Sequence, residues 1–88
     1  MTMTPLYKFT QADAQAVADA CHQYKIAHDL AYAASVAAGH TTAWSHVQQV
    51  GTWSGGVFTA ASPAQWQLFV NPSVKGALSA ADQAAAGL

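Results

Sequence analysis

The sequence has no arginine and no glutamate, and its few charges are three lysines and four aspartates. The formal net charge is only −1 at pH 7, which argues against an acidic mimic of DNA. A nucleic-acid-binding surface needs clustered cations that neutralise phosphates, and guanine is most often contacted by arginine. Because the lysines are spread over positions 8, 25 and 75, we expect no nucleic-acid partner.

Cysteine is equally scarce, since Cys21 is the single one in the chain. A lone cysteine excludes a disulfide within the chain and a structural zinc site built from several cysteines. Cys21 shares an apolar helical face with Val17 and Tyr24, so we expect it to be a buried small side chain and not a nucleophile.

Long apolar runs are absent as well. The most apolar stretch, 26–38, is too short to cross a bilayer and contains His28 and Asp29. The first residues lack a basic segment followed by an apolar one, so secretion by a signal peptide is not expected. The sequence predicts no membrane partner and a location in a virion or in the cytoplasm.

The titratable side chains form no recognisable catalytic or metal-binding pattern. Histidines occur in two pairs, each six residues apart, whereas helical ligands converge at spacings of three or four. The aspartates at positions 13, 19 and 29 are spread around one expected helix and supply no acid–base pair. The sequence therefore predicts no catalytic residues, no metal, no cofactor and no enzymatic activity.

Alanine and aromatic residues are what the chain has in quantity, with 21 alanines and three each of Trp, Tyr and Phe. Residues 11–38 contain neither glycine nor proline and are rich in alanine, the strongest helix former. Thr10 is a suitable N-cap with Asp13 three residues later, and Gly39 offers a C-terminal stop. These signals predict one continuous helix from Gln11 to Ala38.

That helix would carry two apolar faces, one through Val17, Cys21 and Tyr24 and the other through Ile26 and Leu30. A surface helix of a monomer needs only one apolar stripe, so both faces require cover. One cover is the rest of this chain, and the other is a second copy. The alternative is that the remaining residues wrap around both faces.

Further elements follow from local signals. We expect a short helix over 40–51, capped by Thr41 or Thr42, because Trp44, Val47 and Val50 recur at helical spacing. The Ser62-Pro63-Ala64-Gln65 segment predicts a second short helix that ends before Pro72.

Between these segments, two short β-prone triplets flank Gly55-Gly56, which indicates either a hairpin over 52–59 or a glycine-hinged loop. Ser79 to Asp82 would start a final turn or helix that ends at Gly87. The predicted fold class is therefore mainly α, with one long helix, two or three short ones and a small β-hairpin as an option. The expected organisation is an extended arm (1–9), a helical domain (10–70) and an Ala-rich tail (71–88).

The scarcity of charge and the surplus of aromatics favour a non-catalytic structural or assembly protein, a small subunit of a larger particle. In general style, though by no motif, the sequence suits an accessory protein of a phage virion. The alternative is a small regulatory or inhibitor protein that binds one host protein. Both interpretations require protein partners, through self-association or a larger assembly. The expected interaction residues are Trp53, Phe58, Ile26, Leu30, Tyr32 and Tyr7.

Overall fold

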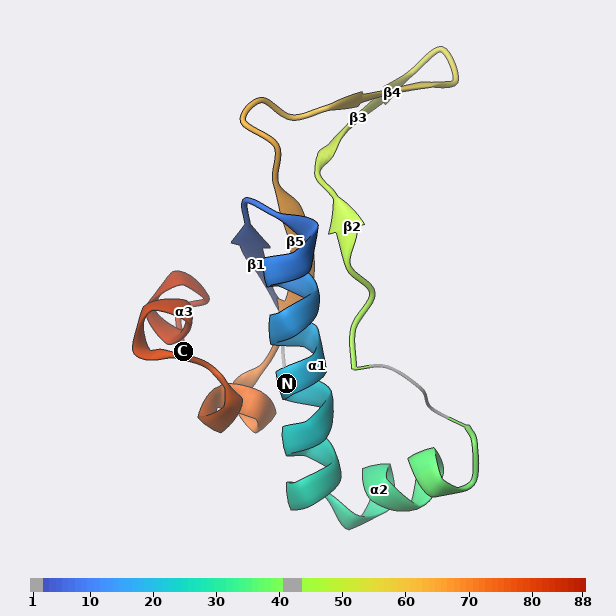
Figure 1. Cartoon of the computed structure of the whole chain (residues 1–88), viewed down its shortest axis with the longest axis vertical. Helices are drawn as coiled ribbons and strands as arrows, with labels where there is room; N and C mark the ends of the chain where they lie inside the picture. Colours follow the sequence, from blue (N-terminus) through green and yellow to red (C-terminus); the bar gives the residue numbers. More distant parts are fainter. Residues whose placement is uncertain (1–2, 41–43) are drawn as a thin grey trace.

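The computed structural model describes residues 3–40 and 44–88 (Figure 1). Of the described residues, 46% are helical and 24% lie in strands, so the fold is mixed α/β and the mainly α prediction is wrong. The elements in chain order are β1 (Thr4–Lys8), α1 (Gln11–His28), α2 (Leu30–Ala37), β2 (Gln48–Gln49), β3 (Gly51–Ser54), β4 (Val57–Ala60), β5 (Trp66–Val70), the 3₁₀ helix η1 (Pro72–Ala77) and α3 (Ala80–Ala85).

A three-stranded antiparallel sheet in the order β1-β5-β2 forms the centre of the body. The central strand β5 has an alternating burial pattern in which Leu68 and Val70 are fully buried. Leu6 of β1 lies directly opposite Leu68 and is also buried. Successive side chains of a strand point to opposite faces, so these three residues share the face that packs against α1.

The hydrophobic core lies between this sheet face, α1 and the C-terminal segment. Helix α1 contributes Ala14, Ala18 and Cys21, all small, which allows the helix to approach the strands closely. The C-terminal segment adds a second group of buried side chains to the same core, namely Val74, Leu78 and Ala86. A chain of this length has a small core, and its tail forms a substantial part of it.

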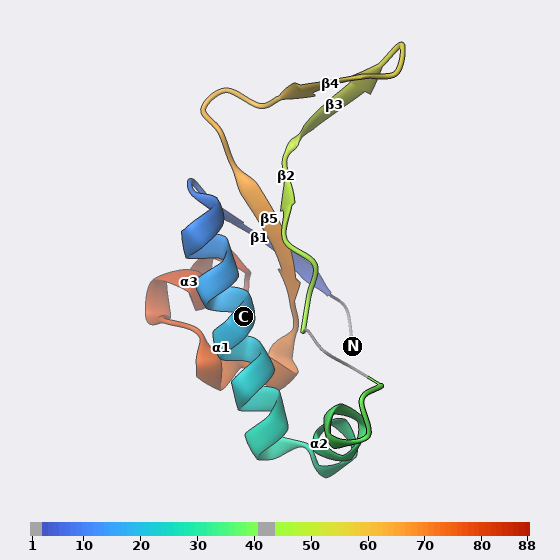
Figure 2. The ribbon, with the colours of Figure 1, turned by 45° about the vertical axis from the view of Figure 1, so that its right-hand side comes forward.

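The predicted continuous helix over 11–38 is wrong, because the helix breaks at Asp29. There the backbone turns to an extended conformation (φ −137°, ψ 107°), and α2 starts in a new direction (Figure 2). The Asp29 N–H donates to the carbonyl of Lys25, and its carboxylate accepts from the N–H of Tyr32 at 3.0 Å. One aspartate thus ends α1 and caps α2, a competition with the helical backbone that favours aspartate at helix ends.

The two short helices, one expected over 40–51 and the other from Pro63 to a stop before Pro72, are also wrong. Thr41, Thr42 and Ala43 lie outside the described residues. Trp44 and Ser45 form a bend, and Gln48–Gln49 is the strand β2. The 66–70 segment is β5, the central strand. The indole N–H of Trp44 donates to the carbonyl of Phe69 at 3.1 Å, and the Ser45 hydroxyl accepts from the Phe69 N–H. Side chains therefore satisfy the edge of β5 that β2 is too short to cover.

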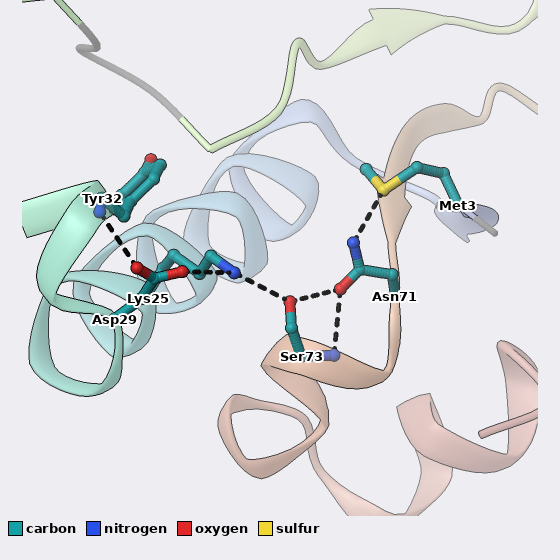
Figure 3. A network of polar contacts seen from close by, with 6 residues as sticks. All are labelled: Met3, Lys25, Asp29, Tyr32, Asn71 and Ser73. Atoms are coloured by element: carbon teal, nitrogen blue, oxygen red, sulfur yellow. Dashed lines mark hydrogen bonds and ion pairs between the residues drawn. The ribbon is translucent and has the colours of Figure 1, made fainter. Parts of the chain in front are cut away.

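A polar network fixes the junction of α1 and α2 against η1 (Figure 3). The Lys25 ammonium lies 3.0 Å from the Asp29 carboxylate and donates to the Ser73 hydroxyl at 3.3 Å. Asn71 caps η1 by accepting from the Ser73 N–H, and its amide donates to the sulfur of Met3 at 3.1 Å. The network joins three parts of the chain that are distant in sequence.

The C-terminal helix α3 begins as expected, with Ser79 accepting a hydrogen bond from the N–H of Asp82 at 3.1 Å. The carboxylate of Asp82 also forms an ion pair with Lys8 of β1, with an N–O distance of 2.5 Å. Ala86, at the end of α3, is buried in the core. The tail thus packs on its own chain, through one ion pair and an apolar contact.

Candidate functional site: the projecting hairpin

Strands β3 and β4 form a hairpin, so the first of the two alternatives for residues 52–59 is confirmed. Trp53 lies opposite Phe58, and Ser54 lies opposite Val57 at the turn. The connecting residues Gly55 and Gly56 both have positive φ, 55° and 78°. A two-residue turn of this type matches the twist of the strands and strongly favours glycine.

The hairpin projects away from the sheet and the helices (Figures 1 and 2). From residue 51 to residue 60, every side chain is exposed except Phe58, which is half-buried. The radius of gyration is 14.3 Å, whereas a compact chain of this length would have about 12 Å. This element lacks cover on both faces, and an isolated two-stranded ribbon is only marginally stable in water.

The register divides the hairpin into two chemically different faces. Residues that lie opposite one another share a face, and the face changes at each step along the strand. One face, named here the aromatic face, comprises Gly51, Trp53, Phe58 and Ala60. The other face, named here the hydroxyl face, comprises Thr52, Ser54, Val57 and Thr59.

The aromatic face is closely packed within itself and open to solvent above. The Phe58 ring lies across Gly51, and a Cβ at position 51 would lie 2.5 Å from that ring. The ring centroids of Trp53 and Phe58 are 5.4 Å apart with an interplanar angle of 58°. Trp53 is 73% exposed, although indole is among the side chains that gain most from burial. The structure thus presents a pre-ordered aromatic pair to solvent.

The stretch of sequence that contains this element carries no charge. All seven charged residues lie on β1, α1, the α1–α2 junction, η1 and α3, and none occurs from position 30 to position 74. Sequence reasoning missed this 45-residue uncharged segment, although the positions of the lysines and aspartates in the sequence define it. It also missed Gly51, Val57 and Ala60 as members of the two hairpin faces. Gly51 and Ala60 alternate with Thr52 and Thr59 at strand period, and Val57 lies on the same face as Thr59.

The structure places the other expected interaction residues apart from the hairpin. Tyr7, 47% exposed, is on the sheet face turned away from α1. Ile26 is half-buried near the end of α1, and Leu30 is 91% exposed at the first position of α2. Tyr32 is half-buried, and its hydroxyl lies 2.8 Å from Nδ1 of His22 in a hydrogen bond. Of the six expected residues, Trp53 and Phe58 are brought together by a ring contact.

Among the described residues, the titratable groups form no second candidate site. Cys21 is fully buried, and burial together with the nearby Asp82 charge raises its pKa to about 11. Such a thiol is protonated and weakly nucleophilic at neutral pH. Within residues 3–40 and 44–88, no three His, Cys, Asp or Glu side chains gather closely enough to hold a metal ion. Nor does any helix in the same ranges have the length and apolar character needed to span a membrane.

Comparison with known protein families, curated sequences and solved structures gives no significant match to this chain. The geometry of the projecting hairpin is therefore the feature of the chain that points to a function.

Proposed function

We propose that this protein is a non-catalytic assembly protein that self-associates through the aromatic face of the β3–β4 hairpin. The observation that carries the proposal is the 73% exposure of Trp53 on a ribbon that no other part of the described chain covers. As part of the same proposal, such a subunit would contribute to a larger particle, such as a virion.

Three features support an interaction role for this surface. Tryptophan is the residue most enriched at the energetic centres of protein interfaces, and the interface core is depleted of charge. The Trp53–Phe58 pair is held in place by its own strand register, which lowers the entropy lost on binding. The uncharged surroundings add no cost of desolvating ions when two protein surfaces meet.

The experiment compares two substitutions on opposite faces of the hairpin by sedimentation velocity. Trp53→Ser removes an exposed apolar side chain from the aromatic face, and Val57→Ser removes one that is 64% exposed from the hydroxyl face. We expect Trp53→Ser to weaken self-association at least tenfold, a typical effect at an interface centre, and Val57→Ser to change it less than threefold. Equal effects of both variants would contradict the assignment of the aromatic face.

A third variant, Leu30→Lys, tests the other exposed apolar residue. Leu30 is 91% exposed, so the lysine is accommodated without unfolding, and we expect self-association to persist. Dissociation by Leu30→Lys but not by Trp53→Ser would move the contact to α2. A wild-type protein that remains monomeric would overturn self-association and favour the inhibitor function, in which the hairpin binds a foreign protein.

A further inference from the structure

We propose that the partner of the hairpin is a second copy of this chain, and that β3 pairs antiparallel with β3 of that copy across a two-fold axis at Thr52. This inference rests on the proposed function and specifies its geometry. It makes one four-stranded sheet from two hairpins.

The hydrogen-bonding pattern shows which backbone groups of β3 are free. In a two-residue hairpin, the pair next to the turn, here Ser54 and Val57, exchanges both of its hydrogen bonds. The pattern alternates, and the Ala61 N–H donates to the Val50 carbonyl at 2.9 Å, as this alternation requires. The N–H and C=O groups of Gly51 and Trp53 therefore point outward, away from β4.

This edge lacks the devices that normally prevent strand pairing. The continuous outer edge of β2 and β3, from residue 48 to residue 54, has neither a charged residue nor a proline. The opposite edge of the main sheet is β1, where Pro5 removes an outward donor and Lys8 adds charge. The edge of β4 also lacks charge and proline, but it is only four residues long. The edge of β2 and β3 is therefore the longest one that lacks both devices.

Antiparallel pairing about Thr52 uses all the free groups of β3. Gly51 of each copy lies opposite Trp53 of the other, and the two pairs form four hydrogen bonds. Thr52 meets Thr52 of the second copy in the close, non-hydrogen-bonded position, a favourable cross-strand combination. The axis is perpendicular to the sheet, so both aromatic faces lie on the same side. The Trp53 side chain of each copy then packs over Gly51 of the other copy, which places the aromatic face within the contact.

Electrostatics and backbone chemistry favour this occupant over others. Two identical surfaces meet without repulsion only when they are neutral or self-complementary, and this one is neutral from residue 30 to residue 74. A lipid surface would leave the outward N–H and C=O groups of the hairpin without partners, whereas a second β3 satisfies them. The self-pairing of an edge strand also needs no sequence outside this chain.

The test is disulfide trapping with two matched threonine positions. Thr52 and Thr59 lie opposite each other on the hydroxyl face, and both are exposed. In the proposed pairing the two Cα atoms of residue 52 are about 4.5 Å apart, within the range of a disulfide, whereas those of residue 59 lie two strands farther apart. Under mild oxidation we expect the Thr52→Cys variant to form a cross-linked dimer at least tenfold faster than the Thr59→Cys variant. Cys21 is buried and does not compete.

Amide hydrogen exchange supplies a second readout on the wild-type protein. The amides of Gly51 and Trp53 should gain protection as the protein concentration rises, while those of Phe58 and Ala60 on the outer edge should not. Faster cross-linking of Thr59→Cys, or protection of the β4 amides alone, would overturn the inference in favour of the β4 edge. Self-association with neither cross-link nor amide protection would also overturn it, and would leave the proposed function intact. A wild-type protein that stays monomeric would overturn both.

Discussion

Tyr24 of α1 lies against Gly76 of η1 so closely that a Cβ at position 76 would be 2.5 Å from the tyrosine hydroxyl oxygen. The contact joins the longest helix to the C-terminal segment, next to the buried side chains of Val74 and Leu78. Position 76 therefore requires a residue without a side chain, for a reason of space and not of backbone conformation.

We expect Gly76→Ala to destabilise the fold by about 1–3 kcal/mol, because the added methyl group displaces the Tyr24 ring from its place. Thermal or urea unfolding would measure the change. In a Tyr24→Ala background the same substitution should have a much smaller effect, since the space is then free. Additive effects of the two substitutions would show that the contact does not determine the stability.

Asp29 carries a second prediction. We expect Asp29→Ala to lower the thermal midpoint, because it removes the cap of α2 and the ion pair with Lys25, while Asp29→Asn should retain the cap and most of the midpoint. Hydrogen bonding from Tyr32 and then from Lys25 lowers the pKa of the Asp29 carboxyl. The contribution of its charge is therefore present above the ordinary pKa of 3.8 and is lost as the pH falls below it. An Asp29→Ala protein with unchanged helicity by circular dichroism would contradict this role.

From the burial of the Cys21 thiol we predict that the protein loses stability at alkaline pH. Burial raises its pKa from 9.0 to about 11, so the unfolded chain releases this proton at a lower pH than the folded protein does. The free energy of unfolding should be insensitive to this group below pH 9 and should fall by about 2–3 kcal/mol between pH 9 and 11. Cys21→Ala is the control, since it loses packing at every pH but lacks this alkaline step. Equal alkaline slopes for the two proteins would contradict the prediction.

A substitution in the glycine turn should affect self-association without affecting the stability of the body. Gly55 has φ 55°, which valine adopts only with strain, whereas asparagine tolerates it. We expect Gly55→Val to disrupt the hairpin and to weaken self-association, while the melting midpoint of the body changes little because the hairpin lies outside the core. Gly55→Asn should behave like the wild type. A large drop in midpoint for Gly55→Val would show that the hairpin supports the body.

Local signals in the sequence predicted the features that depend on neighbouring residues. Thr10 does cap α1, with its hydroxyl accepting from the Asp13 N–H at 3.1 Å, and Ser79 caps α3 in the same way. The Gly55-Gly56 turn was predicted as one of two alternatives. Two consecutive glycines indicate such a turn because glycine adopts a positive φ without strain.

Features that depend on long-range pairing could not be predicted in this way. Ser62, Pro63 and Gln65 together are a good helix start, yet the following residues form the central strand because Leu68 and Val70 are buried at a period of two. Five residues are too few to separate the two periods in the sequence. Alanine content likewise outweighed Asp29 in the prediction of a continuous helix, although aspartate competes for the backbone at a helix end.

Sedimentation velocity of the wild-type protein over a hundredfold range of concentration tests the central claim, that the exposed hairpin exists to join subunits. We predict that the weight-average sedimentation coefficient rises with concentration from the monomer value toward that of a dimer or larger species. Trp53→Ser should shift this rise to at least tenfold higher concentration. A coefficient that stays at the monomer value over the whole range would contradict the claim.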